Sequence, residues 1–368
     1  MPNPNAIVSS VIRFDPPLEK SPTELLRAER GLHVELDDGR RIRLDSSDPR
    51  SVGFVQILDG LSKLRQPVYL ELDQTLSAIT RLLIPHLTRI AGLHQVSDKG
   101  LDVELEASAG HHMLRRGQAD YEVLEKQLRE AVKHHGLIIL TEDDEHRIID
   151  IRNFEPGPDG IPPLCPPFER FPPPKNLLGD IWLWKWWPWK WFGCISMAKA
   201  QQVFDAMKAT SCNPLTVPPP CIPFLYPDDG CWARAHEMCR LMINMGLSPK
   251  KVWIRGNLHV STKNNPNCSV WWGWHVAPTL CVRWPSFFQT QSMVIDPSLF
   301  TTPVSKVAWK GVQGDPNATL ADSDATQYWP DGGTDHAYVD TNIRLAFYRL
   351  QLQNRALQFG SPPYANCP

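Results

Sequence analysis

The sequence lacks several features that would place it in common classes of protein. No apolar run approaches the ~20 residues needed to cross a bilayer, and residues 1–5 do not begin a basic segment followed by an apolar one. A signal peptide is therefore not expected, which leaves a cytoplasmic location or export by a signal-peptide-independent route. The net charge is only −2 at pH 7, so no basic surface for nucleic acid is expected.

Tryptophan and cysteine are both absent before residue 156, although the whole chain contains 14 Trp and nine Cys. Such a change in composition marks a boundary between units of different character. A length of 368 residues also favours two domains, since a domain has about 100–200 residues. We expect an N-terminal domain over 1–155, a Pro-rich and Trp-rich linker over 156–192, and a C-terminal domain over 193–368.

The N-terminal domain is predicted to be α+β. Alternating apolar residues on both sides of Asp38-Gly39 indicate a β-hairpin. Apolar residues with helical spacing predict a helix over 120–135, and a closing hairpin is expected to follow it. Strands are expected at 31–37, 41–44, 68–72, 101–105, 137–140 and 147–151.

No catalytic constellation is evident in the N-terminal domain. Its paired histidines could bind a metal, but adjacent side chains on one element diverge, so solvated side chains are expected instead. The domain is predicted to act as a docking or pro-domain-like module. The paired histidines are His111, His112, His134 and His135.

The linker combines two unusual segments. Prolines throughout 156–175 predict a stiff, extended connector. Residues 182–192 then carry six tryptophans, for which three interpretations remain open. The rings can pack on the C-terminal domain as a latch, cover an active site as a plug, or contact a membrane interface with Lys185 and Lys190 at the headgroups; the membrane contact is the least favoured.

A cysteine stands where a tight turn becomes a helix. Gly230 precedes Cys231, and apolar residues recur at helical spacing over 231–245. The first turn of a helix favours a thiolate, which is a nucleophile; a buried, inert thiol is the alternative. Cys212 and Cys221 are close enough in sequence for a small disulfide in an oxidising compartment.

Two later residues complete the set that a cysteine nucleophile needs. His275 lies in a predicted strand, and Asp296 ends another strand before a proline. If these strands are adjacent, one imidazole nitrogen can face sulfur and the other a carboxylate. The alternatives are a core histidine and a turn aspartate. His236 is a competing base. Cys231, His236 and Cys239 could also be imagined as metal ligands, but their directions on one helix do not converge on one ion, so neither a metal nor a cofactor is expected.

Residues 199–312 resemble bacterial protein-glutaminases, which are enzymes that deamidate glutamine side chains within proteins. The resemblance implies that Cys231, His275 and Asp296 are the catalytic residues. It also implies a C-terminal α+β domain with a transglutaminase-like (papain-like) core. The residues that carry it are Thr210-Ser-Cys212, Tyr226-Pro227, Asp229-Gly-Cys-Trp-Ala-Arg-Ala-His236, Met238, Gly256-Asn-Leu258, Ser261-Thr262, His275-Val-Ala277, Ile295-Asp-Pro-Ser-Leu-Phe300, Val304 and Ala308-Trp309.

The predicted activity is hydrolysis of protein-bound glutamine to glutamate with release of ammonia, through a thioester on the cysteine. Trp232, Trp272 and Trp274 are predicted to bind the substrate by forming a narrow slot; core packing is the alternative. The expected partners are proteins with exposed glutamine. The same three catalytic residues would also serve a transglutaminase or a cysteine protease. A hypothesis of another class is a binding or targeting protein that carries the catalytic domain as cargo.

Overall fold

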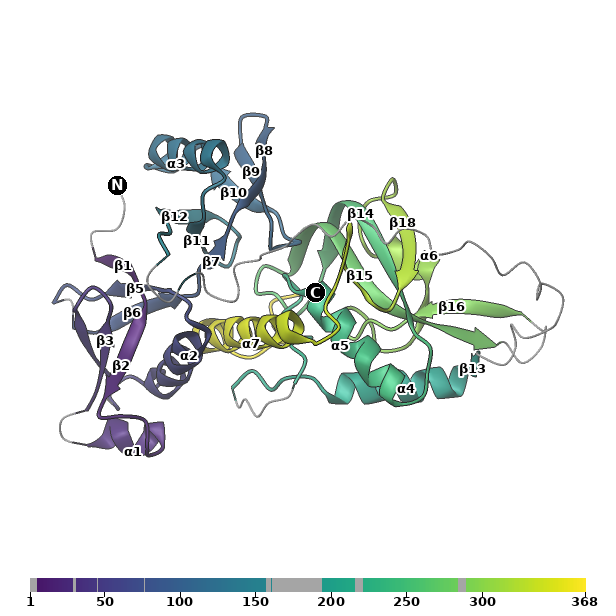
Figure 1. The fold of residues 1–368 in the computed structure, drawn as a ribbon, viewed down its shortest axis with the longest axis horizontal. Coiled ribbons are helices and arrows are strands. Elements are labelled where there is room, and N and C mark those ends of the chain that lie inside the picture. The colour runs from purple at the N-terminus through teal and green to yellow at the C-terminus, as the bar shows by residue number, and fades with distance from the viewer. Residues whose placement is uncertain are drawn as a thin grey trace. The chain divides into compact units, whose positions relative to one another are not determined.

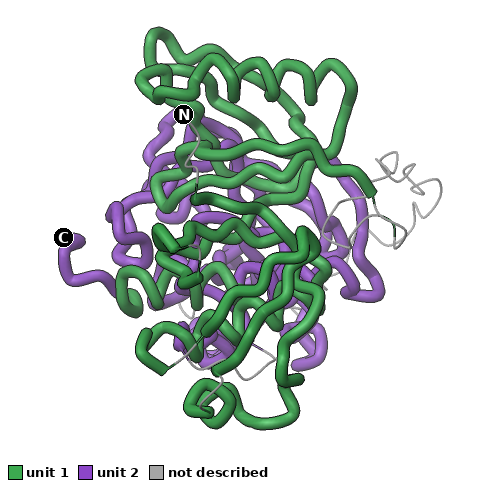
Figure 2. The backbone as a smooth tube through the Cα atoms, turned by 90° about the vertical axis from the view of Figure 1, so that its left-hand side faces the viewer, with its two compact units in different colours: residues 1–166, 349–362 green, residues 167–348, 363–368 purple. Residues whose placement is uncertain are grey.

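The structure is a computed structural model that forms two compact units (Figure 2). Unit 1 comprises residues 1–166 and 349–362, and unit 2 comprises residues 167–348 and 363–368. Both units combine helices with mainly antiparallel sheets, so the predicted α+β class is confirmed. The structure describes residues 5–28, 31–44, 46–75, 77–156, 160, 194–215, 221–283 and 289–368.

Most of the predicted linker lies outside the described residues. Between residues 156 and 194, only residue 160 is described. The latch, plug and membrane interpretations of the Trp-rich segment therefore stay predictions. Among the described helices, none combines the length and the apolar character needed to cross a membrane.

Unit 1 opens with two three-stranded antiparallel sheets. The predicted hairpin is confirmed: its strands join through Gly39, whose φ of 82° lies in the left-handed region that favours glycine. The first sheet has the order β2 (Val11–Asp15), β3 (Leu32–Leu36), β4 (Arg41–Leu44); the second has the order β1 (Ala6–Ser9), β5 (Val68–Leu72), β6 (Ile79–Leu83); α1 (Pro22–Arg27) and α2 (Ser51–Leu64) connect strands.

The second half of unit 1 repeats this arrangement. The predicted helix and the closing hairpin are confirmed, and the helix ends at His135, whose φ of 48° is left-handed. The elements are β7 (His86–Thr88), β8 (Ile90–Val96), β9 (Gly100–Leu105), β10 (His112–Arg115), α3 (Tyr121–His134), β11 (Ile138–Glu142) and β12 (Ile148–Asn153), with sheets ordered β10-β9-β8 and β12-β11-β7.

The two halves are an internal duplication, in which β1–β6 and α2 correspond in order to β7–β12 and α3. Each half pairs its second, third and fourth strands in one sheet and its first, fifth and sixth in the other. The pairing β5–β6 shifts register between Glu71 and Leu72, and β11–β12 shifts at the equivalent Thr141 and Glu142. The halves also share the sequence pattern of 31–36 (GLHVEL) and 100–105 (GLDVEL). We call them repeat 1 and repeat 2.

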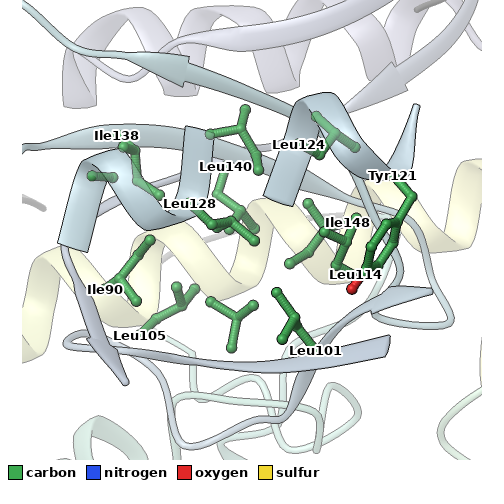
Figure 3. Packing of buried hydrophobic residues seen from close by; sticks show 13 residues of the cluster. Ile90, Leu101, Leu105, Leu114, Tyr121, Leu124, Leu128, Ile138, Leu140 and Ile148 are labelled. Atoms are coloured by element: carbon green, nitrogen blue, oxygen red, sulfur yellow. The ribbon is translucent and has the colours of Figure 1, made fainter. Parts of the chain in front are cut away.

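The core of repeat 2 lies between its helix and its two sheets. Leu124 and Leu128 of α3 point toward Leu140 and Ile148 of one sheet and Leu101 of the other (Figure 3). These side chains are at most 5% exposed, so one apolar cluster holds both sheets to the helix. The expectation that the paired histidines are solvated is wrong for His112, because it is 1% exposed.

Unit 2 is built on a six-stranded sheet (Figure 1). The predicted helix at 231–245 is confirmed. The sheet has the order β17 (Val304–Ser305), β16 (Thr290–Val294), β15 (Ser269–Arg283), β14 (Lys250–Ser261), β18 (Thr319–Asp324), and β13 (Ile195–Ser196) pairs with β15. A separate pair is formed by β19 (Gln327–Trp329) and β20 (Gly332–Thr334). The helices are α4 (Met197–Ala209), α5 (Cys231–Asn244), α6 (Lys306–Gly311) and the start of α7 (Val339–Phe359).

The end of α7 belongs to unit 1 and packs there on α2. An added Cβ would lie 2.4 Å from Leu357 at Gly53 and 2.8 Å from Leu350 at Gly60. These two glycines are seven residues apart and therefore lie on one face of α2. That face lets α7 approach closely, and Asn354 adds a hydrogen bond to the Leu82 carbonyl at 3.0 Å.

Six cysteines form disulfides among the described residues. The predicted Cys212–Cys221 pair is confirmed. Cys194–Cys281 and Cys268–Cys367 close much longer loops, of 87 and 99 residues in sequence separation. Cys231 and Cys239 are free and buried, so the nucleophile candidate is one of two thiols in α5.

Candidate active site

The turn before α5 places Cys231 at the start of the helix. Gly230 has a φ of 76°, which favours glycine, and a Cβ there would lie only 2.3 Å from the Tyr348 ring. Tyr348 also donates a hydrogen bond to Asp229 at 2.6 Å. Any larger residue at 230 would therefore disturb both the turn and the packing beneath Cys231.

Cys231 is 3% exposed. Burial raises the pKa of its thiol well above the ordinary value, although Arg234 and a hydrogen bond from the Val276 backbone act in the opposite direction. Loss of solvent thus acts against the thiolate that the helix position favours.

His275 and Asp296 form the expected pair. Their strands are neighbours: β15 runs antiparallel to β16, and Asp296 follows the end of β16. The His275 Nε2 atom lies 2.9 Å from Asp296 Oδ2, and both side chains are at most 3% exposed. A buried carboxylate beside a ring nitrogen fixes the orientation and the tautomer of the imidazole.

The other ring nitrogen of His275 is unbonded. Nδ1 is buried and has no hydrogen-bond partner among the described residues, the sulfur of Cys231 included. The next residue in β15, Val276, hydrogen-bonds to that sulfur through its backbone. The structure thus brings the thiol to the segment that carries the imidazole, and it leaves Nδ1 as the nitrogen that can accept a proton.

Two indole rings enclose the imidazole. The ring of Trp272 stacks on His275 with centroids 4.6 Å apart, and the ring of Trp309 stacks at 5.4 Å. Trp309 also donates from Nε1 to Asp296 Oδ2 at 2.9 Å. Reasoning from strand and helix patterns did not assign Trp309 to the site, although it is among the residues that carry the family resemblance.

Asp296 remains ionised in this environment. Burial acts to raise its pKa, but the interactions with His275 and the hydrogen bond from Trp309 outweigh that effect and lower the pKa of the carboxyl. Trp309 therefore supports the charge that orients the imidazole.

The loop before α5 is held by buried polar contacts. Arg234 is 2% exposed and donates to the Tyr226 carbonyl at 2.9 Å, as well as to the Asp229 carbonyl. Trp272 donates from Nε1 to the Asp228 carbonyl at 2.8 Å. These contacts fix the backbone around Cys231 to the strand that carries His275.

The three tryptophans predicted to bind substrate are buried to different degrees. Trp272 is 1% exposed and Trp232 is 0% exposed, whereas Trp274 is half-buried. The ring of Trp232 contacts that of Trp274 at 5.7 Å and that of Trp329 at 4.9 Å between centroids. Trp329 is a further ring beside the site that the sequence did not single out.

His236 lies in a separate polar cluster. Its Nδ1 atom is 2.9 Å from the Lys251 Nζ atom, and its Nε2 atom is 3.2 Å from the Asp335 carbonyl oxygen. Burial together with the charge of Lys251 lowers the pKa of His236 to about 4, and burial lowers the pKa of Lys251 to about 8. His236 is thus a neutral imidazole that accepts from an ammonium group, with both nitrogens engaged.

Comparison with known proteins identifies a family for unit 2. Residues 200–313 match a family model described as "Glutaminase". A crystal structure of protein-glutaminase is 33% identical over 41% of this chain and 85% of its own length, with a TM-score of 0.37. The NMR structure of protein-glutaminase from Chryseobacterium proteolyticum is 30% identical over 48% of this chain and 94% of its own, with a TM-score of 0.36.

A crystal structure of pro-protein-glutaminase is 24% identical over 78% of this chain and 99% of its own, with a TM-score of 0.49. No curated protein sequence matches the chain.

Proposed function

We propose, given that the chain belongs to the protein-glutaminase family through residues 200–313, that it hydrolyses the carboxamide of glutamine side chains in proteins and releases ammonia. One observation supports the chemistry most directly. His275 carries an aspartate on one nitrogen and a buried, unbonded nitrogen on the other, beside the backbone that contacts Cys231.

The proposed reaction begins with proton transfer from the Cys231 thiol to His275 Nδ1. The sulfur then attacks the carboxamide carbon, and the imidazolium returns the proton to the departing ammonia. Asp296 stabilises the imidazolium and holds its tautomer. A thioester remains, and water activated by the neutral imidazole attacks it and releases glutamate.

The carboxamide oxygen acquires negative charge during the attack. The backbone N–H groups at the start of α5, including that of Cys231, have no partner within the helix and are the proposed donors. A well-placed donor of this kind contributes about 3–4 kcal/mol. Arg234 supports the donors indirectly, because it holds the loop that precedes them.

The three tryptophans have different proposed parts in substrate binding. Trp274 is the one that a glutamine side chain can contact with least rearrangement, because it is half-buried. Trp272 orients the imidazole by stacking, and Trp232 supports Trp274 from below. A narrow aromatic slot would admit a flexible side chain and exclude a backbone amide.

The test measures three products from one protein substrate. The full chain is incubated with a casein-like protein, and ammonia, cross-links and backbone fragments are followed together. Ammonia without cross-links or fragments is expected. Polymers would indicate a transglutaminase, and fragments a protease.

Two variants test the roles of the residues. Cys231→Ala is expected to abolish ammonia release, whereas Cys239→Ala, which removes the other buried thiol of α5, is expected to retain it. Full activity in Cys231→Ala would reject the assignment of the nucleophile.

Unit 1 is proposed either to dock a partner protein or to inhibit the activity of unit 2. A variant that lacks residues 1–155 distinguishes the two roles if it remains folded. Unchanged activity on a free peptide with lost activity on a native protein indicates docking, and increased activity on the peptide indicates inhibition.

A further inference from the structure

Repeat 2 of unit 1 contains a buried cluster of two histidines and one glutamate. His86 begins β7, His112 begins β10, and Glu142 ends β11. Their potential ligand atoms all lie within 4.8 Å of one another. We call these three residues the His–Glu cluster.

The cluster is closely packed. Glu142 Oε2 lies 2.5 Å from His112 Nδ1, and Glu142 Oε1 lies 3.3 Å from His86 Nε2. The side chains of the three residues are between 1% and 9% exposed. Two imidazoles therefore point at one carboxylate in a site that water scarcely reaches.

A second layer of polar residues surrounds the cluster. Ser108 Oγ lies 2.9 Å from the outer nitrogen of His112, and His146 Nδ1 lies 2.8 Å from Glu142 Oε1. Residues that ligate metals in proteins are held by outer hydrogen bonds of this kind, which fix the tautomer of a histidine and the position of a carboxylate.

Repeat 1 shows that the fold itself does not require these polar residues. By strand register, His86 corresponds to Ile7, since they pair with the equivalent Leu140 and Leu70. His112 corresponds to Ile42, because they pair with the equivalent Val103 and Val34.

Glu142 corresponds to Leu72 at the shared register shift. In repeat 1 the three positions are apolar and at most 5% exposed. Repeat 2 therefore places three ionisable groups where its duplicate has ordinary core residues. Burying such groups is costly unless they are paired or bind a metal.

We propose that the His–Glu cluster binds one divalent transition-metal ion of the zinc class. Two imidazole nitrogens and one carboxylate oxygen are a common ligand set for Zn²⁺ and do not suit Mg²⁺ or Ca²⁺, which prefer oxygen ligands. Bonds of about 2.0–2.1 Å in a tetrahedron place neighbouring ligand atoms about 3.3 Å apart. The potential ligand atoms of the three residues lie within 4.8 Å of one another, so they need to shift by at most about 1.5 Å to reach this spacing.

The test measures metal bound to the full chain after treatment with chelator. The protein is dialysed against zinc chloride, and bound zinc is counted by elemental analysis. About one zinc per chain is expected. Cobalt(II) in place of zinc should give the visible absorption of a four-coordinate site without a thiolate charge-transfer band, which separates this site from Cys231 and Cys239.

The matched variant transfers the residues of repeat 1 into repeat 2 as H86I/H112I/E142L. It removes every ligand yet keeps an apolar core, so it is expected to fold and to bind less than one tenth of an equivalent of zinc. His134→Ala is the control, because His134 is an exposed histidine beside a carboxylate in the same unit; it should bind zinc as the wild type does. Ser108→Ala should weaken binding by about 10–100-fold.

Equal zinc binding by the triple variant and the wild type would overturn the proposal. A wild type that retains no zinc or cobalt at micromolar concentration would do so too, since the cluster is then only a hydrogen-bonded network. If the triple variant does not fold, the proposal is tested by comparing the wild type with Glu142→Gln. Zinc should raise the unfolding temperature of the wild type but not that of Glu142→Gln, and an unchanged wild-type temperature contradicts the site.

Discussion

At the scale of single residues, the site is organised around one ring. Two indoles hold the plane of His275, and one carboxylate engages its Nε2 atom. The imidazole can therefore present only Nδ1 to a reacting group. This arrangement makes Trp309 a positioning residue, because it contacts both the imidazole and the carboxylate that orients it.

Trp309→Phe tests this role. Phenylalanine preserves an aromatic face but removes the hydrogen bond to Asp296. In the wild type that hydrogen bond lowers the pKa of the carboxyl, so its loss should raise the pKa. Hydrogen bonds to charged groups contribute about 1.5–3 kcal/mol, so we expect ammonia release to fall by about tenfold or more. The acid limb of the pH–rate profile should move to higher pH.

Trp253→Phe is the matched control for Trp309→Phe. Trp253 is buried in β14, and its Nε1 atom donates to Ser323 at 2.8 Å rather than to Asp296. Its variant should keep the wild-type pH profile. A Trp309→Phe profile that superimposes on that of the wild type would show that Trp309 only fills space.

The neutral state of His236 predicts a loss of stability in acid. Its pKa is about 4 in the folded chain against 6.5 ordinarily, so the unfolded chain binds the proton first as the pH falls. Stability is therefore unaffected by this group above pH 6.5 and decreases as the pH falls from 6.5 to 4. A difference of this size corresponds to on the order of 3 kcal/mol.

The measurement is denaturant unfolding between pH 7 and pH 4, followed by the fluorescence of the tryptophans. His236→Gln should show a shallower decrease than the wild type because an amide does not titrate. His134→Gln should decrease as the wild type does, since His134 is exposed. Parallel curves for His236→Gln and the wild type would assign the decrease to other groups.

The residues of the site could be predicted from sequence better than their ionisation. The sequence shows the order of Cys231, His275 and Asp296 together with the turn–helix and strand patterns around them. A short connection between the two strands predicts that β15 and β16 are adjacent. The raised pKa of Cys231 could not be predicted, because it depends on how completely distant segments bury the sulfur. Trp309 shows the same limitation, since a tryptophan in a short helix gives no local sign of what it contacts.

At the scale of elements, the duplication in unit 1 was present in the sequence but weakly marked. The shared pattern of residues 31–36 and 100–105 covers only six positions. Repeat 1 also contains α1 (Pro22–Arg27), for which repeat 2 has no counterpart between β8 and β9. Strand pairing and register reveal the duplication because they persist when side chains have diverged.

The two helices of the repeats differ where α7 packs. Gly53 and Gly60 of α2 correspond to Val123 and Glu130 of α3. The face of α3 that carries these two residues is not covered by α7, and the Val123 side chain is 58% exposed. Gly53→Val should therefore clash with Leu357 and destabilise unit 1 by about 1–3 kcal/mol, the usual cost of overpacking.

Thermal unfolding of the full chain measures this effect. Val123→Gly is the reciprocal variant, and it should cost only about 1 kcal/mol through helix propensity. Gly53→Val with an unchanged unfolding temperature would mean that the end of α7 is not closely packed on α2.

At the scale of the whole molecule, the chain leaves unit 2 at residue 348, contributes 349–362 to unit 1, and returns to unit 2 for its last residues. Cys268–Cys367 binds this returning segment covalently. The hydrogen bond from the Tyr364 backbone to the Lys263 carbonyl, 2.7 Å long, lies beside it. The disulfide thus closes a loop that contains residues of both units.

Removal of this disulfide should reduce stability more than removal of the short one. In the chain-entropy description, the stabilisation grows with the logarithm of loop length. The loops have sequence separations of 99 and 9, so C268S/C367S should be less stable than C212S/C221S by about 2 kcal/mol. Calorimetry of both double variants beside the wild type, without reductant, gives the comparison. If the two variants unfold at the same temperature, local packing around each disulfide, rather than the restriction of the unfolded chain, determines their contributions.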